Sequence, residues 1–356
     1  MVVVFLPVMG IQLREIIPEE AIMNVEPGFF KGKKVSVDAF NAIYQFLSTI
    51  RQQDGTPLMD SQGKVTSHLS GIFYRNLRLI EAGISVSYVF DGKARAEKLE
   101  TLKIRERAKQ EAEEKYEEAL KEGDLESARK FSQRTSRLDE GMIKEAKELL
   151  EALGIPVVQA PTEGEAQASF LARKGVVDFA ASQDYDCLLF GAPNLVRNLS
   201  VTNKRKMPGT SRYVDVPIEI IELESVLAGL GISQEQLIIL GILVGTDYNP
   251  GGIRGIGPKK ALKLVTTEKT FDKIFDKIKD SWTFGIEPKD LASLFEKPEI
   301  DNSIDNLNSK TIDSKKVIEI MCSRHDFSEE RIQNSLDKVL NSLKESKKQK
   351  GLNQWF

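Results

Sequence analysis

The chain has 356 residues, 41% hydrophobic and 29% charged, which is the balance of a globular protein with one large or two ordinary domains. Its two cysteines and two histidines are isolated, which argues against a disulfide framework, a zinc ribbon and a Ser/His/Asp triad. The net charge of −3 lacks the basic excess of most DNA-binding proteins, although basic residues occur in local groups. The apolar start, residues 2–8, is too short to span a membrane, so we expect an intracellular, soluble protein.

In chain order, strand patterns alternate with helix patterns over the first two thirds of the sequence. We expect strands at 35–37, 86–90, 155–158, 177–181 and 195–199, and helices at 42–51, 67–82, 143–153 and from 163 onward. The charge-dense stretch 93–137 predicts exposed helices that project from the body. From residue 234 the pattern is helical around a glycine-rich turn at 251–257, and the polar stretch 296–315 predicts a loop or short helix. The sequence therefore predicts an α/β fold with a central, mostly parallel sheet flanked by helices.

Seven carboxylates stand where an apolar segment gives way to a turn. They are Asp38, Asp91, Glu163, Glu165, Asp184, Asp186 and Asp247. Ligands bind at the carboxyl edge of open parallel sheets, so we expect these acids to gather there. Gathered carboxylates repel one another and tend to take up protons unless they share a cation. Oxygen ligands with so few histidines and cysteines indicate Mg²⁺ or Mn²⁺ rather than zinc.

Several of these acids also have a purely structural interpretation. Thr162 and Glu165 fit a capping box, and Glu163 would sit beside Glu165 in the favourable first turn of a helix. Taken alone, Asp38 and Asp91 are better explained as turn residues after a strand. For these four acids the structural and the metal-binding interpretations both stay open.

The remaining three acids favour metal binding more strongly. Asp184 and Asp186 lie two residues apart in a short loop, a spacing suited to joint metal binding. Asp247 follows an expected helix at 234–244, at the negative end of its dipole, where an acid is unfavourable without a nearby cation. The coincidence of seven such positions in one α/β body makes a shared metal site the stronger interpretation.

A basic stripe follows Asp91. Lys98, Arg105 and Lys109 share one face of an expected helix over roughly 16 Å. A solvated helix face is the simpler alternative. Because the stripe begins close to Asp91, we expect its start to lie over the acids, where it would contact a phosphate that the carboxylates repel.

The glycine-rich turn is not a Walker A loop, because Pro258 follows Gly257 where that motif requires lysine. It is better interpreted as a hairpin between two helices that contacts a DNA backbone through its N–H groups and basic side chains. The residues proposed for this contact are Gly252, Arg254, Gly255, Gly257, Lys259 and Lys260. A plain helix-packing turn is the alternative.

The last eight residues carry a spaced apolar pattern after a lysine-rich segment. Its members are Gln349, Leu352, Trp355 and Phe356. A Trp-Phe pair at a free end is unusual in a soluble monomer and predicts an anchor that inserts into a partner's pocket.

The sequence resembles the archaeal flap endonucleases, members of the structure-specific 5′ nuclease superfamily, from Gly10 to Phe356. The segments that carry the resemblance are VSVDAFNAIYQFL, VFDGKAR, APTEGEAQAS, SQDYDCLLFG, GTDYNPGGIRGIGPKKAL and HDFSEER. The family's Met-Gly start matches Met9-Gly10, which residues 1–8 precede, so we expect Met9 to be the initiator.

The resemblance implies a PIN-like nuclease fold and assigns roles to particular residues. The seven acids match the family's ligands for two Mg²⁺ ions, with Mn²⁺ as a possible substitute, and Lys98 and Arg105 match its catalytic basic residues. Tyr44 matches the residue that stacks on an unpaired base, with Arg51 expected on the same helix. The glycine hairpin matches a helix-two-turn-helix that grips duplex DNA through a bound K⁺.

The resemblance also implies a domain organisation and a set of partners. We expect an N-terminal nuclease region at 1–109, a helical arch or linker at 110–137, an intermediate nuclease region at 127–269, a C-terminal helical region at 270–347 and a tail at 348–356. The tail matches a motif that docks on the replication sliding clamp (PCNA). The implied protein is a cytoplasmic prokaryotic monomer that binds 5′-flap, nicked and branched DNA and no membrane.

The implied activity is two-metal hydrolysis of 5′-flap DNA, with 5′–3′ exonuclease activity, in Okazaki fragment maturation and base excision repair. One alternative is a non-catalytic, clamp-bound scaffold at DNA junctions, in which the acids would be dispensable. Another is a Mg²⁺-dependent phosphohydrolase of small molecules, which would have no use for the hairpin, the arch or the tail.

Overall fold

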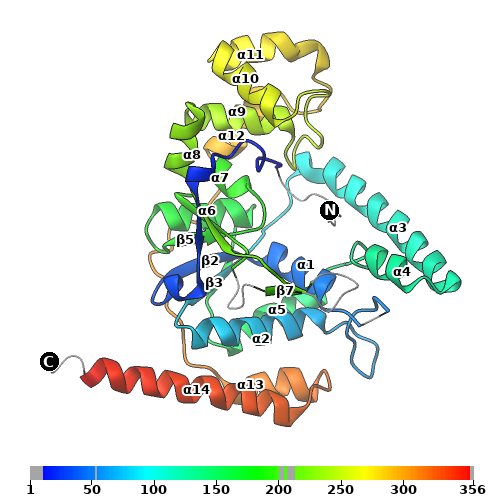
Figure 1. The fold of residues 1–356 in the computed structure, drawn as a ribbon, viewed down its shortest axis with the longest axis vertical. Coiled ribbons are helices and arrows are strands. Elements are labelled where there is room, and N and C mark those ends of the chain that lie inside the picture. Colours follow the sequence, from blue (N-terminus) through cyan, green and yellow to red (C-terminus); the bar gives the residue numbers. More distant parts are fainter. Residues whose placement is uncertain (1–10, 53, 200–203, 207–212, 353–356) are drawn as a thin grey trace.

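The structure, a computed structural model, describes residues 11–52, 54–199, 204–206 and 213–352 (Figure 1). Its main sheet has the strand order β1-β9-β6-β5-β2-β3-β4. The five strands from β6 to β4 are parallel, and β9 and β1 continue one edge antiparallel. The strands are β1 (Ile22–Val25), β2 (Lys34–Asp38), β3 (Ser85–Phe90), β4 (Val157–Gln159), β5 (Phe179–Ala181), β6 (Asn194–Arg197) and β9 (Ile218–Glu222). A separate pair joins β7 (Lys204–Lys206) to β8 (Tyr213–Asp215).

Helices cover both faces of this sheet, so its central strands β3 and β5 are buried along almost their whole length. On one side pack α6 (Gly164–Arg173), α7 (Asp186–Leu189), α8 (Leu223–Leu230) and α9 (Gln234–Val244). On the other side pack α1 (Ala39–Thr49), α2 (Ser67–Glu81), α5 (Glu140–Ala152) and α14 (Glu329–Leu352). The predicted α/β architecture with a mostly parallel sheet is confirmed, and the antiparallel strands β1 and β9 were not predicted.

The charge-dense segment forms two helices that project from the body as an arch (Figure 1). A single 3₁₀ turn (Ala96–Lys98) leads into α3 (Leu99–Glu122), and α4 (Leu125–Ser132) folds back against it. Gly123 lies between them with φ of 72°, a left-handed conformation that suits glycine at a helix end. Buried alanines at 112, 119 and 128 join the two helices, while the exposed surface carries many charged residues and a few apolar side chains such as Leu102 and Leu125.

The C-terminal third is helical. Above α9 in Figure 1 lie α10 (Pro258–Glu268) and α11 (Phe271–Ile278), and α12 (Pro288–Glu296) packs against α9. Below the sheet lie α13 (Ser314–Ile318) and a π turn (Glu319–Ser323). Short 3₁₀ turns occupy Glu19–Ala21, Pro27–Phe30 and Lys279–Ser281. Among the described residues no single helix is long and apolar enough to cross a membrane; only α8 and α9, bent by 81°, pass that test as a pair.

The polar stretch after α12 runs over the body as a strap without helix before α13, in agreement with the loop prediction. Gln167 holds it through both amide atoms, donating to the Asp301 carbonyl at 3.0 Å and accepting from the Asp301 N–H at 2.7 Å. Further along, the Lys310 N–H donates to the Gly154 carbonyl at 2.8 Å. These backbone contacts attach the C-terminal helices to the nuclease body.

Candidate active site

Six of the seven acids lie at the carboxyl ends of four adjacent parallel strands. Asp38 is the last residue of β2, and Asp91 follows β3 directly. Glu163 and Glu165 lie at the N-cap and in the first turn of α6, which follows β4. Asp184 lies in the loop after β5, and Asp186 is the first residue of α7. Because β5, β2, β3 and β4 are neighbours in the sheet, these short connections bring the six acids to one edge.

Asp247 reaches the same edge from the loop that follows α9, a helix of the layer on one side of the sheet. This loop is tightly built, because Gly252 has φ of 58° and its Cα stands so close to α9 that a Cβ would lie 2.3 Å from the Val244 carbonyl carbon. The Ile253 N–H donates to the Leu243 carbonyl at 2.9 Å. Only glycine fits this turn, so the hairpin fixes the position of Asp247.

Local hydrogen bonds orient the carboxylates. The Gly164 N–H donates to Asp91 Oδ1 at 2.7 Å, and the Ser182 hydroxyl donates to Glu165 Oε1 at 2.7 Å. The Ile11 N–H donates to Asp186 Oδ1 at 3.0 Å. Each acid is therefore held by a group from a different part of the chain.

Asn41 links two of the acids. Its backbone N–H donates to Asp38 Oδ1 at 3.2 Å, and its side-chain amide donates to Asp184 Oδ2 at 3.0 Å. The amide oxygen of Asn41 accepts from the Gln183 N–H at 3.3 Å. Sequence reasoning missed Asn41, although its position in the first turn after Asp38 was a usable signal.

The structural interpretation of the glutamates is right only in part, because Glu165 does lie in the first turn of α6. Helix α6 begins at Gly164 with Glu163 as its N-cap, and no side chain caps it, so Thr162 and Glu165 form no capping box. The turn alternative for Asp38 is half right, because Asp38 does cap α1 with one oxygen. Capping by itself does not account for the burial of Asp38 among other acids.

Burial, followed by repulsion from the neighbouring acids, raises the pKa of most of these carboxyls. The pKa rises to about 8 at Asp38, about 7 at Asp186 and about 6 at Asp91, and well above the ordinary range at Glu165 and Asp184. Such a cluster is stable at neutral pH only when it is partly protonated or when cations neutralise it. Its donor atoms are all carboxylate oxygens, the ligands that Mg²⁺ and Mn²⁺ prefer.

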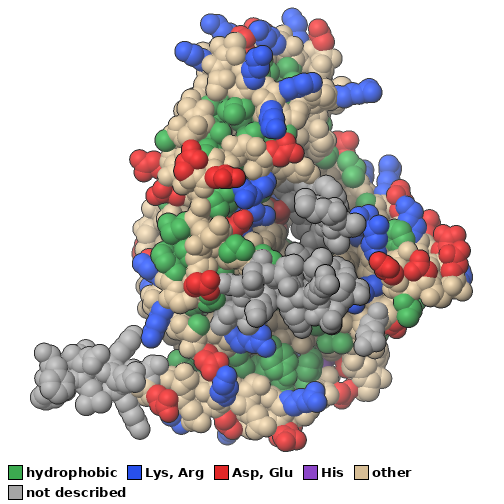
Figure 2. Space-filling model, viewed as in Figure 1, with side chains coloured by type: hydrophobic (Ala, Val, Ile, Leu, Met, Phe, Trp, Pro, Cys, Tyr) green, Lys and Arg blue, Asp and Glu red, His purple; other side chains and the backbone are tan. Residues whose placement is uncertain are grey.

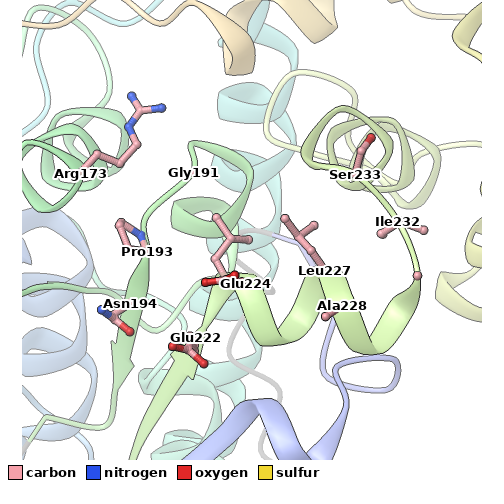
Figure 3. Close-up of a pocket in the computed structure, with 12 residues that line it drawn as sticks. Arg173, Gly191, Pro193, Asn194, Glu222, Glu224, Leu227, Ala228, Ile232 and Ser233 are labelled. Carbon is pink, nitrogen blue, oxygen red and sulfur yellow. The ribbon is translucent and has the colours of Figure 1, made fainter.

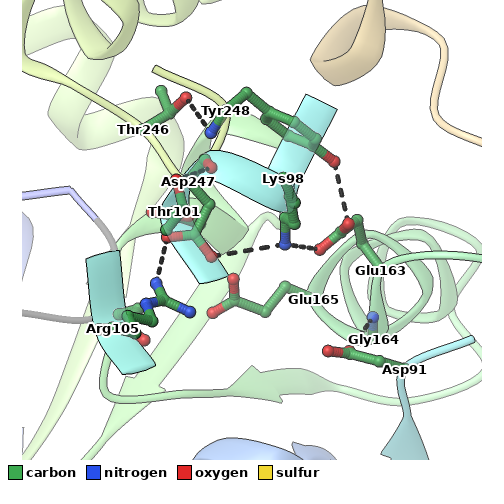
Figure 4. A network of polar contacts seen from close by, with 12 residues as sticks. Asp91, Lys98, Thr101, Arg105, Glu163, Gly164, Glu165, Thr246, Asp247 and Tyr248 are labelled. Carbon is green, nitrogen blue, oxygen red and sulfur yellow. Dashed lines mark hydrogen bonds and ion pairs between the residues drawn. The ribbon is translucent and has the colours of Figure 1, made fainter. Parts of the chain in front are cut away.

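Two cations of the arch already point into the cluster (Figure 4). The ammonium of Lys98 forms an ion pair with Glu163 and lies 3.4 Å from Asp247 Oδ2, and the guanidinium of Arg105 pairs with Asp247 Oδ1. Burial by itself would lower the pKa of Lys98, but Glu163 and Asp247 outweigh burial and raise it. In the described part of the chain no three acid, histidine or cysteine side chains are arranged to hold a metal ion, and two of the acids, Glu163 and Asp247, are paired with these cations instead.

The predicted basic stripe continues to Lys109, whose Nζ lies 5.2 Å from the centre of the Tyr44 ring on α1. Tyr44 is half-buried between α1 and the arch, and burial raises its pKa. The structure therefore brings the acids, the stripe and the predicted stacking residue together.

Arg51 differs from its prediction, because α1 ends at Thr49 and Arg51 lies beyond it. Its guanidinium donates to the carbonyls of Leu47 and Gly55, both at 2.9 Å, and to the Ser136 hydroxyl at 2.9 Å. These contacts tie the loop after α1 to the end of the arch. A DNA contact by Arg51 stays a prediction.

The glycine hairpin follows Asp247 in the chain, between α9 and α10, and presents its basic side chains to solvent. Gly255 has φ of 80° and Gly257 caps α10, while Arg254, Lys259 and Lys260 are exposed. Lysine and arginine side chains gather over α10 and α11 on the face seen in Figure 2. The side chains of Gln349 and Leu352, at the end of α14, and the residues Trp355 and Phe356 lie outside the described part.

An open pocket of ≈ 820 Å³ lies elsewhere, between α8, α9 and the end of α6 (Figure 3). Arg173, Glu222, Leu227 and Ser233 are among its lining residues, and none of the seven acids is. It therefore contributes nothing to the cluster.

Comparison with known proteins identifies the family. Residues 9–112 match the XPG N-terminal domain and residues 154–247 the XPG I-region. The chain is 52% identical over 348 residues to Flap endonuclease 1 of Pyrococcus furiosus, covering 98% of this chain and 99% of that protein. It is 48% identical over 351 residues to Flap endonuclease 1 of Staphylothermus marinus, covering 98% and 100%. The chain belongs to the flap endonuclease family.

A solved flap endonuclease-1 from Methanococcus jannaschii matches 95% of this chain and 100% of its own, with a TM-score of 0.72 and 39% identity. The catalytic core of Rad2 in complex with a DNA substrate shares the fold, with a TM-score of 0.69 and 24% identity. This flap endonuclease is thus a metal-dependent nuclease of α/β architecture that acts on DNA. Its seven acids fall in the two segments that the XPG domains match, whereas the end of α3 and all of α4 lie between those segments.

Proposed function

We propose that this enzyme hydrolyses one phosphodiester bond of branched DNA at the base of a 5′ flap, with 5′–3′ exonuclease activity at free ends. The observation that carries this proposal is the meeting of seven carboxylates with two arch cations at one sheet edge. The acids attract divalent cations but repel phosphate. The arch cations attract phosphate, so the two sets together suit phosphodiester hydrolysis.

The seven acids would hold two Mg²⁺ ions, or Mn²⁺ as a substitute. Bound divalent ions would supply an activated water and stabilise the leaving oxygen. With divalent ions bound to the acids, Lys98 and Arg105 would be free to contact the scissile phosphate instead of Glu163 and Asp247. Both are largely buried, so their charge acts on the phosphate with little screening by water.

The remaining predicted contacts place the DNA around this site. Tyr44 would stack on an unpaired base next to the cut, with Lys109 and Arg51 nearby. The hairpin from Gly252 to Lys260 would follow the duplex backbone, with K⁺ at the turn. The arch α3–α4 would enclose the free 5′ strand. These roles suit removal of displaced strands in Okazaki fragment maturation and base excision repair, in the cytoplasm.

Cleavage of a labelled 5′-flap duplex tests this function. We expect a 5′-phosphorylated nick and a released flap with Mg²⁺, slower cleavage with Mn²⁺, and none with EDTA. Equal cleavage in EDTA would contradict the metal-dependent mechanism. Hydrolysis of small phosphate esters without flap cleavage would favour the phosphohydrolase alternative, and the family relationship gives no support to a non-catalytic scaffold.

We also propose that the C-terminal tail docks a monomer of this enzyme on the replication sliding clamp. The support is the sequence pattern Gln349, Leu352, Trp355 and Phe356 alone. Deleting residues 349–356 should leave cleavage without the clamp unchanged and abolish stimulation by the clamp. Stimulation that persists in the truncated chain would refute this role.

A further inference from the structure

Tyr248, which follows Asp247, contacts both an acid and a cation of the active site (Figure 4). Its hydroxyl donates to Glu163 Oε1 at 3.0 Å, and the ammonium of Lys98 lies 5.2 Å from the centre of its ring. Lys98 in turn pairs with the other oxygen of Glu163. Each of the three side chains, Tyr248, Glu163 and Lys98, therefore contacts the other two.

The ring of Tyr248 is fixed from behind. Its residue is only 5% exposed, and its ring meets Phe295 of α12 edge-on at 5.7 Å between centres. Phe295 packs on Phe190 at 5.0 Å. Because the aromatic contacts come from separate elements, the ring presents a constant face to Lys98.

The backbone of Tyr248 is fixed as well. Its N–H donates to the Thr246 hydroxyl oxygen at 3.1 Å, and the Thr246 hydroxyl donates to Asn249 Oδ1 at 2.7 Å. The Asn249 amide donates to the Ile242 carbonyl on α9 at 2.7 Å. This buried network connects the tyrosine to the same turn that places Asp247.

We propose that Tyr248 is a positioning residue with two separable actions: its hydroxyl orients Glu163 for divalent-ion binding, and its ring face holds the Lys98 ammonium over the scissile phosphate. This inference rests on the roles proposed above for Glu163 and Lys98. Burial and the adjacent Glu163 raise the pKa of Tyr248, so the hydroxyl keeps its proton and remains a donor. A group that orients a metal ligand in this way typically changes metal affinity 10- to 100-fold when it is removed.

Two substitutions separate these actions. Tyr248→Phe keeps the ring and removes the hydroxyl, and Tyr248→Leu removes both, with Tyr248→Met as the substitute if the leucine variant does not fold. Tyr88→Phe is the matched control, because it removes another buried tyrosine hydroxyl, which lies 3.2 Å from Asn76 Oδ1. Folding is checked by thermal unfolding without metal.

The first readout is binding of Mn²⁺ alone, measured by calorimetry without DNA. We expect Tyr248→Phe to weaken Mn²⁺ binding by roughly tenfold or more and Tyr88→Phe to leave it unchanged. The affinity for flap DNA, measured in Ca²⁺ so that binding is followed without cleavage, should be unchanged in both variants. Unchanged Mn²⁺ affinity in Tyr248→Phe would overturn the role of the hydroxyl.

The second readout is the single-turnover cleavage rate at saturating Mg²⁺. We expect the ring-less variant to cleave on the order of tenfold more slowly than Tyr248→Phe, the effect of losing a partly buried cation–π contact. In a Lys98→Met background this difference should disappear. If it persists there, the ring acts only by packing and the proposal is overturned. If the wild-type enzyme does not cleave flap DNA at all, the proposed function itself is refuted.

Discussion

Replacing Asp184 by alanine should abolish flap cleavage and leave flap binding intact. Asp184 is half-buried beside other acids and is held by Asn41, so its loss removes a proposed metal ligand without removing any cation that attracts DNA. Removing a group that only orients a metal ligand already lowers metal affinity or activity about 10- to 100-fold, so we expect the loss of a ligand to lower the rate by more than about 100-fold. Single-turnover cleavage and fluorescence anisotropy on the same flap measure the two effects.

Without metal, the Asp184→Ala variant should be more stable to thermal unfolding than the wild type. Burial and repulsion from Asp186 raise the pKa of Asp184 in the folded state. The contribution of this carboxyl to the free energy of unfolding is therefore present at low pH and is lost as the pH rises and the group ionises. At pH 8 the variant should therefore unfold at a higher temperature than the wild type in EDTA, and Mg²⁺ should raise that temperature less. Asp305→Ala, an exposed acid that pairs with Lys174, is the control. Cleavage retained by Asp184→Ala would refute the metal assignment.

Replacing Lys98 by methionine should slow cleavage by about 10²- to 10³-fold, the usual cost of removing one preorganised group that stabilises transition-state charge. Methionine keeps an unbranched chain of similar length on the Tyr248 ring and removes only the charge. Flap binding should weaken far less, because the hairpin and the rest of the arch keep their cations. Rate and affinity are measured on the same substrate.

Lys103→Met provides a matched control on the same arch helix. Lys103 is exposed and forms no ion pair with another described residue, so its loss should change the cleavage rate little. An equal loss in both variants would show that the arch acts through its overall charge. It would contradict a specific role for Lys98.

The sheet and the acid positions were predictable because both signals are local. A short β-branched run followed at once by an acid defines the end of a strand, and parallel neighbours align those ends, as Asp38 and Asp91 show. Strand β1, by contrast, has only Val25 buried among its four residues, so its pattern carried little strand signal. It belongs to the sheet through pairing with β9, which lies far away in the sequence.

Contacts across the chain explain what the sequence did not reveal. The sequence indicated that Asp247 needs a cation, but not that Lys98 and Arg105 would both supply it from the arch. No local pattern singled out Tyr248, whose hydroxyl donates to Glu163 in the structure. Arg51 was expected on a helix that ends two residues earlier. Each of these depends on tertiary packing rather than on a local pattern.

Locating divalent ions in crystals grown with Mn²⁺ tests the central claim most directly. Anomalous scattering should reveal two Mn²⁺ ions about 4 Å apart among the seven carboxylates, with Lys98 and Arg105 displaced from Glu163 and Asp247. Ions found elsewhere, or an empty cluster in which both cations keep their ion pairs, would contradict it.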